Sequence, residues 1–274
     1  MEYQEILYNT LDGVATITIN RPDTLNALTS LTQAEIKHAL FMSDTTEEVI
    51  GTVITGAGRG FCSGVDMKSL GKISDDGKRT QDVFKHLEVS FENENKNFLG
   101  SPAYFLALKK PLIAAINGAC AGLGFSYATF CDMRFMDRTA KVVTSFSPRG
   151  LIAEHGTSWM LPKIVGPSHA LDLMWTSRRV DAEEAYRIGY ANRLSENGEA
   201  LKEAQDFIFN LSKTSAPYSL MMMKKQIYQH LNQDLELSNT ESTTWMDESL
   251  KRDDFKEGIK SFLEKRSPNF KRIK

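Results

Sequence analysis

Hydrophobic and polar positions alternate in the first half of the chain as they do where strands are separated by helices. Residues 14–19 (VATITI) follow the period of two that is typical of a strand, and turn residues follow directly at 20–23 (NRPD). The apolar stretches 49–55 and 112–116 predict two further short, buried strands. Three strands in this half therefore anchor the predicted fold.

Helical patterns lie between these strands and take over in the second half. A helix is predicted over about 30–42, because Thr32 and Glu35 have the spacing of a capping box and apolar residues mark roughly one face. From about residue 156 onward the pattern is helical, with glycine and proline at the breaks. Strands interleaved with helices, followed by helices alone, predict an α/β core that carries a C-terminal helical region.

The polar stretch 68–97 differs from its surroundings, because it contains few apolar residues and many charges. We expect it to form a mobile loop and an exposed helix. Segments of this kind often act as lids over sites, but a plain solvated surface has the same composition.

Composition narrows the class of protein without assigning a function. The chain has 274 residues, of which 41% are hydrophobic and 25% charged, so it can bury a core in one large domain. Its 33 basic and 35 acidic residues give a net charge of −2, which favours neither nucleic acid nor an anionic membrane. No apolar stretch approaches the roughly 20 residues of a membrane helix. The three cysteines lack paired spacing and the first residues lack a signal-peptide pattern, which predicts a cytoplasmic protein.

Two predicted strands run directly into glycine-rich turns, at 56–64 (GAGRGFCSG) and 117–124 (NGACAGLG). A strand that ends in small residues and opens a helix leaves backbone N–H groups unpaired, and such groups bind oxyanions. The first turn lacks the lysine and hydroxyl of a phosphate loop, and its glycines do not have dinucleotide-binding spacing. Two separate donor turns fit the oxygen of one polarised carbonyl better than a phosphate.

The motifs around these turns resemble those of the crotonase, or enoyl-CoA hydratase/isomerase, superfamily. The resemblance extends from about residue 3 to residue 270, in the family's order. The motifs that carry it are NRPDTLNAL (20–28), GRGFCSGVDM (58–67), INGACAGLGFSYATFCDMR (116–134), RGLIAEHGTSWMLPKIVG (149–166) and FLEKRSPNF (262–270).

The resemblance implies a fold, a ligand and an assembly. The expected fold is a spiral of repeated ββα turns over 1–200, followed by a helical region over 201–274 that mediates trimers or dimers of trimers. The expected ligand is an acyl-CoA thioester, with no nucleic acid or membrane partner and no metal or redox cofactor.

The resemblance also assigns roles to residues of the two turns. The backbone N–H groups of Val65 and Leu123 match the family's oxyanion donors, and leucine at the second position narrows the pocket. The residues expected to bind substrate or coenzyme A are Leu25, Ala27, Cys62, Ser63, Gly64, Asp66, Met67, Gly122, Ser126 and Phe146. Arg21 or Lys68 is expected to meet the coenzyme A phosphates, and Phe84, Leu87, Phe91 and Tyr104 the acyl end.

The acid and base positions decide the expected reaction. Family hydratases use two glutamates, and the matching positions here hold Ser126 and Phe146. Glu154 matches the acidic residue of the family's double-bond isomerases, and moving a double bond needs only one carboxylate. Glu154 could instead complement the start of the next helix. We expect His155 to pack or cap rather than react.

We therefore predict an isomerase that uses Glu154. A hydratase with atypical acid and base residues, an acyl-CoA hydrolase, and a non-catalytic acyl-CoA-binding protein are the alternatives that the sequence leaves open.

Overall fold

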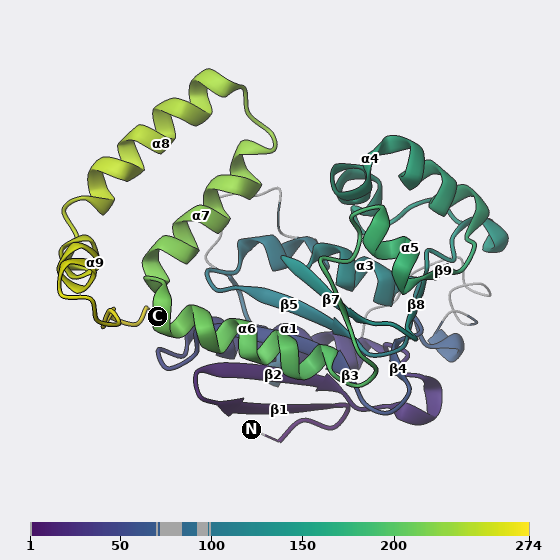
Figure 1. The fold of residues 1–274 in the computed structure, drawn as a ribbon. Coiled ribbons are helices and arrows are strands. Elements are labelled where there is room, and N and C mark those ends of the chain that lie inside the picture. The colour runs from purple at the N-terminus through teal and green to yellow at the C-terminus, as the bar shows by residue number, and fades with distance from the viewer. Residues whose placement is uncertain (1, 70, 72–83, 92–97, 99, 274) are drawn as a thin grey trace.

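Two sheets organise the core of the protein (Figure 1). The computed structural model describes residues 2–69, 71, 84–91, 98 and 100–273. The first sheet has the order β1-β2-β3-β5-β7-β10 and is parallel except for the antiparallel pair β1 and β2. Its strands are β1 (Ile6–Leu11), β2 (Val14–Ile19), β3 (Gly51–Gly56), β5 (Leu112–Ile116), β7 (Met133–Asp137) and β10 (Arg193–Ser195).

The second sheet has the order β4-β6-β8-β9, and its first three strands each follow a strand of the first sheet along the chain. Its strands are β4 (Gly60–Cys62), β6 (Ala119–Ala121), β8 (Lys141–Val143) and β9 (Val180–Asp181). Each repeat therefore places one strand in each sheet before the chain turns back. Helix α3 (Leu123–Phe130) follows β6, and α4 (Thr157–Thr176) follows β8 after a loop. This arrangement confirms the predicted α/β spiral of ββα turns.

Helices α1 (Ser30–Thr45) and α6 (Ala200–Thr214) pack on the first sheet, whereas the last three helices lie beyond it. Helix α1 packs on β1, β2 and β3, and α6 packs on β3, β5 and β7. Ala204 and Ile208 of α6 join Val53, Ile113 and Phe135 in one buried cluster. Helix α5 (Ala182–Arg187) lies beside β9 and β10. The green and yellow helices α7 (Pro217–His230), α8 (Leu235–Ser249) and α9 (Asp253–Leu263) extend away from the sheets (Figure 1).

The strand predictions at 14–19 and 112–116 are confirmed, and the third strand begins at Gly51. The capping box predicted for α1 is wrong in its register. Thr29 is the N-cap and Thr32 occupies the third helical position, because these two threonines satisfy each other's backbone N–H groups. Glu35 is instead buried and accepts from the backbone N–H groups of Gln4 and Glu5, at 2.7 and 2.8 Å.

The expectation of helices alone after residue 156 is also wrong, because β9 and β10 lie in that half. Each has only two or three residues, which is too short to show a periodic pattern. The loop and helix predicted within 68–97 fall largely outside the described residues. In the part of the chain that the structure describes, no helix is long and apolar enough to cross a membrane.

Candidate functional site

Within the described part of the chain, the turn after β4 leaves one backbone amide without a partner. Gly64 has a φ of +108°, a conformation that favours glycine, and the chain turns here. A β-bridge then joins Val65 to Leu28, but its hydrogen bonds use atoms on either side of Val65. The Leu28 N–H donates to the Gly64 carbonyl at 2.7 Å, and the Asp66 N–H donates to the Leu28 carbonyl at 3.0 Å. Among the described residues, the Val65 N–H therefore has no acceptor.

The turn after β6 leaves a second such amide. Gly122 has a φ of +53° and is the N-cap of α3, with no side-chain cap. Leu123 is the first residue of the helix, where the N–H groups have no partner inside the helix. No acceptor for the Leu123 N–H lies within the described ranges of the chain. The positive end of the helix dipole adds to the field at this amide.

The two turns are in contact with each other. A Cβ added to Gly64 would lie 3.1 Å from the Ala121 carbonyl oxygen and 3.5 Å from the Leu123 nitrogen. A Cβ added to Gly124 would lie 2.5 Å from the Cys62 carbonyl oxygen. Only glycine permits this approach, so the sequence sets two unpartnered amides side by side. Together they form a candidate oxyanion hole.

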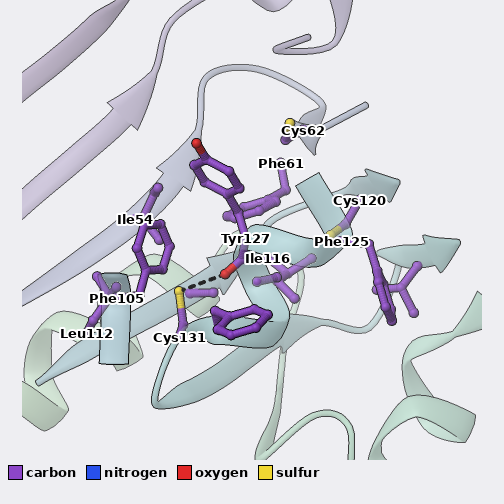
Figure 2. Close-up of a cluster of buried hydrophobic side chains, with 14 of the residues drawn as sticks. Ile54, Phe61, Cys62, Phe105, Leu112, Ile116, Cys120, Phe125, Tyr127 and Cys131 are labelled. Atoms are coloured by element: carbon purple, nitrogen blue, oxygen red, sulfur yellow. Dashed lines mark hydrogen bonds between the residues drawn. The ribbon is translucent and has the colours of Figure 1, made fainter. Parts of the chain in front are cut away.

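Buried side chains support both turns (Figure 2). Phe61 and Cys62 come from β4, Cys120 from β6, and Phe125 and Tyr127 from α3. Burial raises the pKa of Cys62 to about 12 and that of the Cys120 thiol well above its ordinary value. These thiols are therefore protonated core groups and not nucleophiles.

The loop between β2 and α1 lies along the first turn. The Ser63 N–H donates to the Leu25 carbonyl at 2.9 Å, and the Ser63 hydroxyl donates to the Thr24 carbonyl at 3.0 Å. The segments predicted to hold coenzyme A, Leu25 with Ala27 and residues 62–64, are thus neighbours. Their contact with coenzyme A stays a prediction.

Arg21 ties this loop to the oxyanion turn. Its guanidinium contacts Glu5 at 3.2 Å and Asp66 at 3.1 Å, and it donates to the Ala27 carbonyl. These contacts give Arg21 a supporting role in the turn, and its predicted contact with phosphate stays a prediction. Asp66 Oδ1 also accepts the Lys68 N–H at 3.0 Å, as expected of a helix N-cap.

Ser126 and Phe146, which the resemblance matches to the two hydratase glutamates, are both buried. The hydroxyl of Ser126, one turn into α3, lies 2.9 Å from the hydroxyl of Thr157. Phe146 fills its position with an apolar ring, and its backbone N–H donates to the Ser177 hydroxyl at 3.2 Å. The Ser126 contact joins the oxyanion helix to the first residue of α4.

Glu154 lies in the turn directly before α4. Its carbonyl accepts the Thr157 N–H at 3.1 Å, and its side chain is 24% exposed. His155 follows with a φ of +57°, and its Nε2 atom lies 3.5 Å from Glu154 Oε1. Through Thr157 and Ser126, the acid and the oxyanion helix belong to one hydrogen-bonded unit.

Sequence reasoning missed two residues of this unit. Thr157 was overlooked although it lies three positions after Glu154, a spacing that could have suggested a shared turn. Ser101 was missed because it contributes its backbone carbonyl, which accepts from His155 Nδ1 at 3.2 Å and leaves no mark in the sequence.

The segment predicted to meet the acyl end is described only in part. Leu87 and Tyr104 are buried, and the Phe91 ring stacks on Tyr104 with centroids 5.4 Å apart. Phe84 is half-buried, and Met67 of the first turn is exposed. Residues 70, 72–83, 92–97 and 99 of this segment fall outside the described ranges, and the contact of the segment with an acyl chain stays a prediction.

Comparisons with known proteins agree with this geometry. The family model for enoyl-CoA hydratase/isomerase matches residues 9–273. The chain is 30% identical over 265 residues to 1,2-epoxyphenylacetyl-CoA isomerase of Escherichia coli K12, covering 97% of each chain. It is 28% identical over 272 residues to the short-chain-enoyl-CoA hydratase of Clostridium acetobutylicum, again covering 97% of each chain. An enoyl-CoA hydratase/isomerase structure from Mycobacterium paratuberculosis is similar with a TM-score of 0.84 at 28% identity, covering 98% of this chain and 99% of that chain.

The match to the family model includes both glycine turns and the acid-bearing turn before α4. The structural likeness extends over nearly the whole chain, including the C-terminal helices. This protein therefore belongs to the enoyl-CoA hydratase/isomerase family of the crotonase superfamily and is an enzyme of that type.

Proposed function

We propose that the enzyme moves the double bond of an enoyl-CoA thioester, with Glu154 as both base and acid. The Glu154 carboxylate takes a proton from the α carbon of a 3-enoyl thioester, and the electron pair of that C–H bond forms a dienolate. The Val65 and Leu123 N–H groups hold the thioester oxygen as it gains charge. Glu154 then returns the proton to the γ carbon, which gives the 2-enoyl thioester; the reverse direction uses the same groups.

The observation that carries the proposal is the contrast between three positions. By the resemblance, Ser126 and Phe146 match the positions of the hydratase glutamates, whereas Glu154 matches the acid of the isomerases. Hydration across a double bond uses one group to activate water and another to deliver a proton, whereas isomerisation returns the same proton. A single carboxylate is sufficient for isomerisation.

The energetic demand on each group is reasonable. Loss of one preorganised oxyanion donor typically costs about 3 to 4 kcal/mol of transition-state stabilisation. A positioned general acid or base typically contributes about 10²- to 10⁴-fold in rate. Neither contribution needs a metal or redox cofactor, and the proposed reaction uses none.

The proposed assembly is a trimer or a dimer of trimers. Apolar side chains of the C-terminal helices support an intermolecular contact, because Ile227 of α7 is 61% exposed and Phe262 and Leu263 of α9 are 81% and 73% exposed. Copies of the chain that pack against one another through these helices would bury these apolar side chains.

The test is a panel of 2-enoyl and 3-enoyl thioesters of increasing chain length, assayed with the wild type and with Glu154→Gln. We expect wild-type isomerisation and a loss of about 10²- to 10⁴-fold in kcat for the variant, because glutamine cannot accept the proton. Glu199→Gln is the matched control, since Glu199 is exposed at the start of α6 and remote from the turns. Unchanged turnover in Glu154→Gln would remove the assigned role.

The same panel separates the alternative functions. A 3-hydroxyacyl product would indicate hydration by atypical groups, and free thiol would indicate hydrolysis. Calorimetric binding across the panel with no isomerised product would exclude isomerisation of these thioesters.

A further inference from the structure

His155 lies between Glu154 and a backbone carbonyl of a distant segment. Its Nδ1 atom lies 3.2 Å from the Ser101 carbonyl oxygen, 54 positions earlier in the chain, and its Nε2 atom lies 3.5 Å from Glu154 Oε1. The His155 side chain is 19% exposed, so both contacts are largely shielded from water. One imidazole thus connects the acid to the rest of the fold.

The carbonyl contact fixes which ring nitrogen carries a proton. A carbonyl oxygen can only accept, so the proton of this hydrogen bond is on Nδ1. The Nε2 atom is then directed at the carboxyl group in either protonation state of that group. A ring protonated on both nitrogens donates from Nε2 to the carboxylate, and once Glu154 has taken the substrate proton it donates to the carbonyl oxygen of the carboxylic acid, so the ring keeps its own protons throughout.

The backbone aims the ring in this direction. His155 has a φ of +57°, in the left-handed region where histidine and asparagine are enriched among non-glycine residues, and Gly156 follows with a φ of +73°. A ring fixed by two contacts in this conformation has little freedom. Its anchor is also fixed, because the Ser101 hydroxyl lies 3.2 Å from the Tyr127 hydroxyl on the oxyanion helix α3.

We propose that His155 is a positioning residue for Glu154, and this inference rests on the proposed isomerase function. Anchored on Ser101, the imidazole holds the Glu154 carboxyl group in one orientation toward the reacting carbons in both halves of the proton shuttle. The separation of 3.5 Å is that of an ion pair rather than a short hydrogen bond. Catalytic contacts of this kind commonly tighten when substrate binds.

His155→Asn separates this role from a purely structural one. Asparagine tolerates the left-handed backbone and its amide can keep the bond to the Ser101 carbonyl, but it is too short to reach Glu154. We expect kcat to fall by roughly 10- to 100-fold, with KM changed by less than about twofold, because a carboxylate displaced by about 1 Å loses that much rate. A His155→Asn enzyme with wild-type kcat would overturn the proposal. His169→Asn, exposed on α4, is the control for the substitution itself.

A double-mutant cycle tests whether His155 acts through Glu154. In the Glu154→Gln background, His155→Asn should reduce the residual kcat by less than about twofold, because the group that it orients is absent. An additive loss in the double variant would contradict the proposal, since it would mean that the histidine acts independently of the acid.

A spectroscopic measurement gives an answer that does not depend on activity. In protein labelled with ¹⁵N-histidine, the His155 signals are assigned by their loss in His155→Asn. Glu154→Gln should shift the Nε2 signal of His155 and leave the Nδ1 signal, held by Ser101, in place. An unmoved Nε2 signal overturns this inference, whereas full activity of Glu154→Gln overturns only the proposed function, so the two failures are distinguishable.

Discussion

The two halves of the candidate site use different groups of the chain: backbone N–H groups in one and side chains in the other. The oxyanion half consists of the Val65 and Leu123 N–H groups, which glycines at 64 and 122 bring side by side. The acid half consists of side chains at three positions, of which only Glu154 carries a carboxylate. Backbone donors depend on how the chain turns, whereas an acid can be gained or lost by one substitution.

This difference explains how one fold can carry different reactions. Under the proposed mechanism, a substitution at Ser126 or Phe146 would leave both glycine turns, and with them the stabilisation of the enolate, in place while the proton donor changes. The relatives named above include both an isomerase and a hydratase. Under the proposed mechanism, the shared half would set the class of substrate chemistry and the variable half would select the reaction.

The comparison predicts that replacing one glycine of the oxyanion half with alanine lowers the activity. In Gly64→Ala the added Cβ would lie 3.1 Å from the Ala121 carbonyl oxygen, at a φ of +108° that alanine rarely adopts. The turn must shift, and kcat/KM should fall by about 10²- to 10³-fold, the usual cost of one lost oxyanion donor.

Gly198→Ala is the matched control for Gly64→Ala. Gly198 also has a positive φ, of +86°, but a Cβ there would meet no atom within 4 Å. The Gly198→Ala variant therefore has the strain of a positive φ at alanine without crowding a site. Its free energy of unfolding should fall, while its kcat/KM stays near that of the wild type. Steady-state kinetics and thermal unfolding of both variants measure the difference. Equal activity of the two variants would show that the approach of the turns does not matter.

A second prediction concerns the support of the backbone half. Arg21→Met removes the guanidinium that joins Glu5, Asp66 and the Ala27 carbonyl, and it leaves the largely buried Asp66 carboxylate without that partner. We expect a loss of roughly 3 kcal/mol in the free energy of unfolding, as for other ion pairs broken on one side. We also expect kcat/KM to fall about tenfold as the turn loosens, which is far less than for a removed donor.

Arg138→Met tests whether this loss is specific to Arg21. Arg138 also contacts two acids, Glu183 and Glu196, but these partners are exposed. Exposed pairs contribute little to stability because water and salt screen them, so this variant should be nearly neutral in denaturant unfolding and in activity. A larger loss in Arg138→Met than in Arg21→Met would contradict the assigned support.

The same contrast between backbone and side chain decides what the sequence could predict. The strands at 14–19 and 112–116 and the two glycine turns were predicted because local patterns determine them. Strands β9 and β10 were missed, since two or three residues show no period and form only because neighbouring strands pair with them.

Long-range side-chain partners were beyond local reasoning. The partners of Arg21 lie 16 and 45 positions away, and no spacing rule connects them to it. The Ser101 carbonyl that anchors His155 is a group that every residue possesses. The position of Glu154 was predictable by resemblance, whereas its imidazole support required the folded chain.

The smallest predicted effect lies at Ser126, and it tests whether the acid half depends on this position. Ser126→Ala removes a buried hydroxyl and leaves the hydroxyl of Thr157 without that partner, which should cost about 1 to 2 kcal/mol of stability. Because serine carries no proton at the reacting carbons in the proposed mechanism, kcat should change by less than about fivefold. Thermal unfolding and kinetics on the preferred thioester measure both quantities. A loss of kcat as large as that of Glu154→Gln would place Ser126 among the reacting groups, and the contrast between a single acid and a neutral partner position would no longer hold.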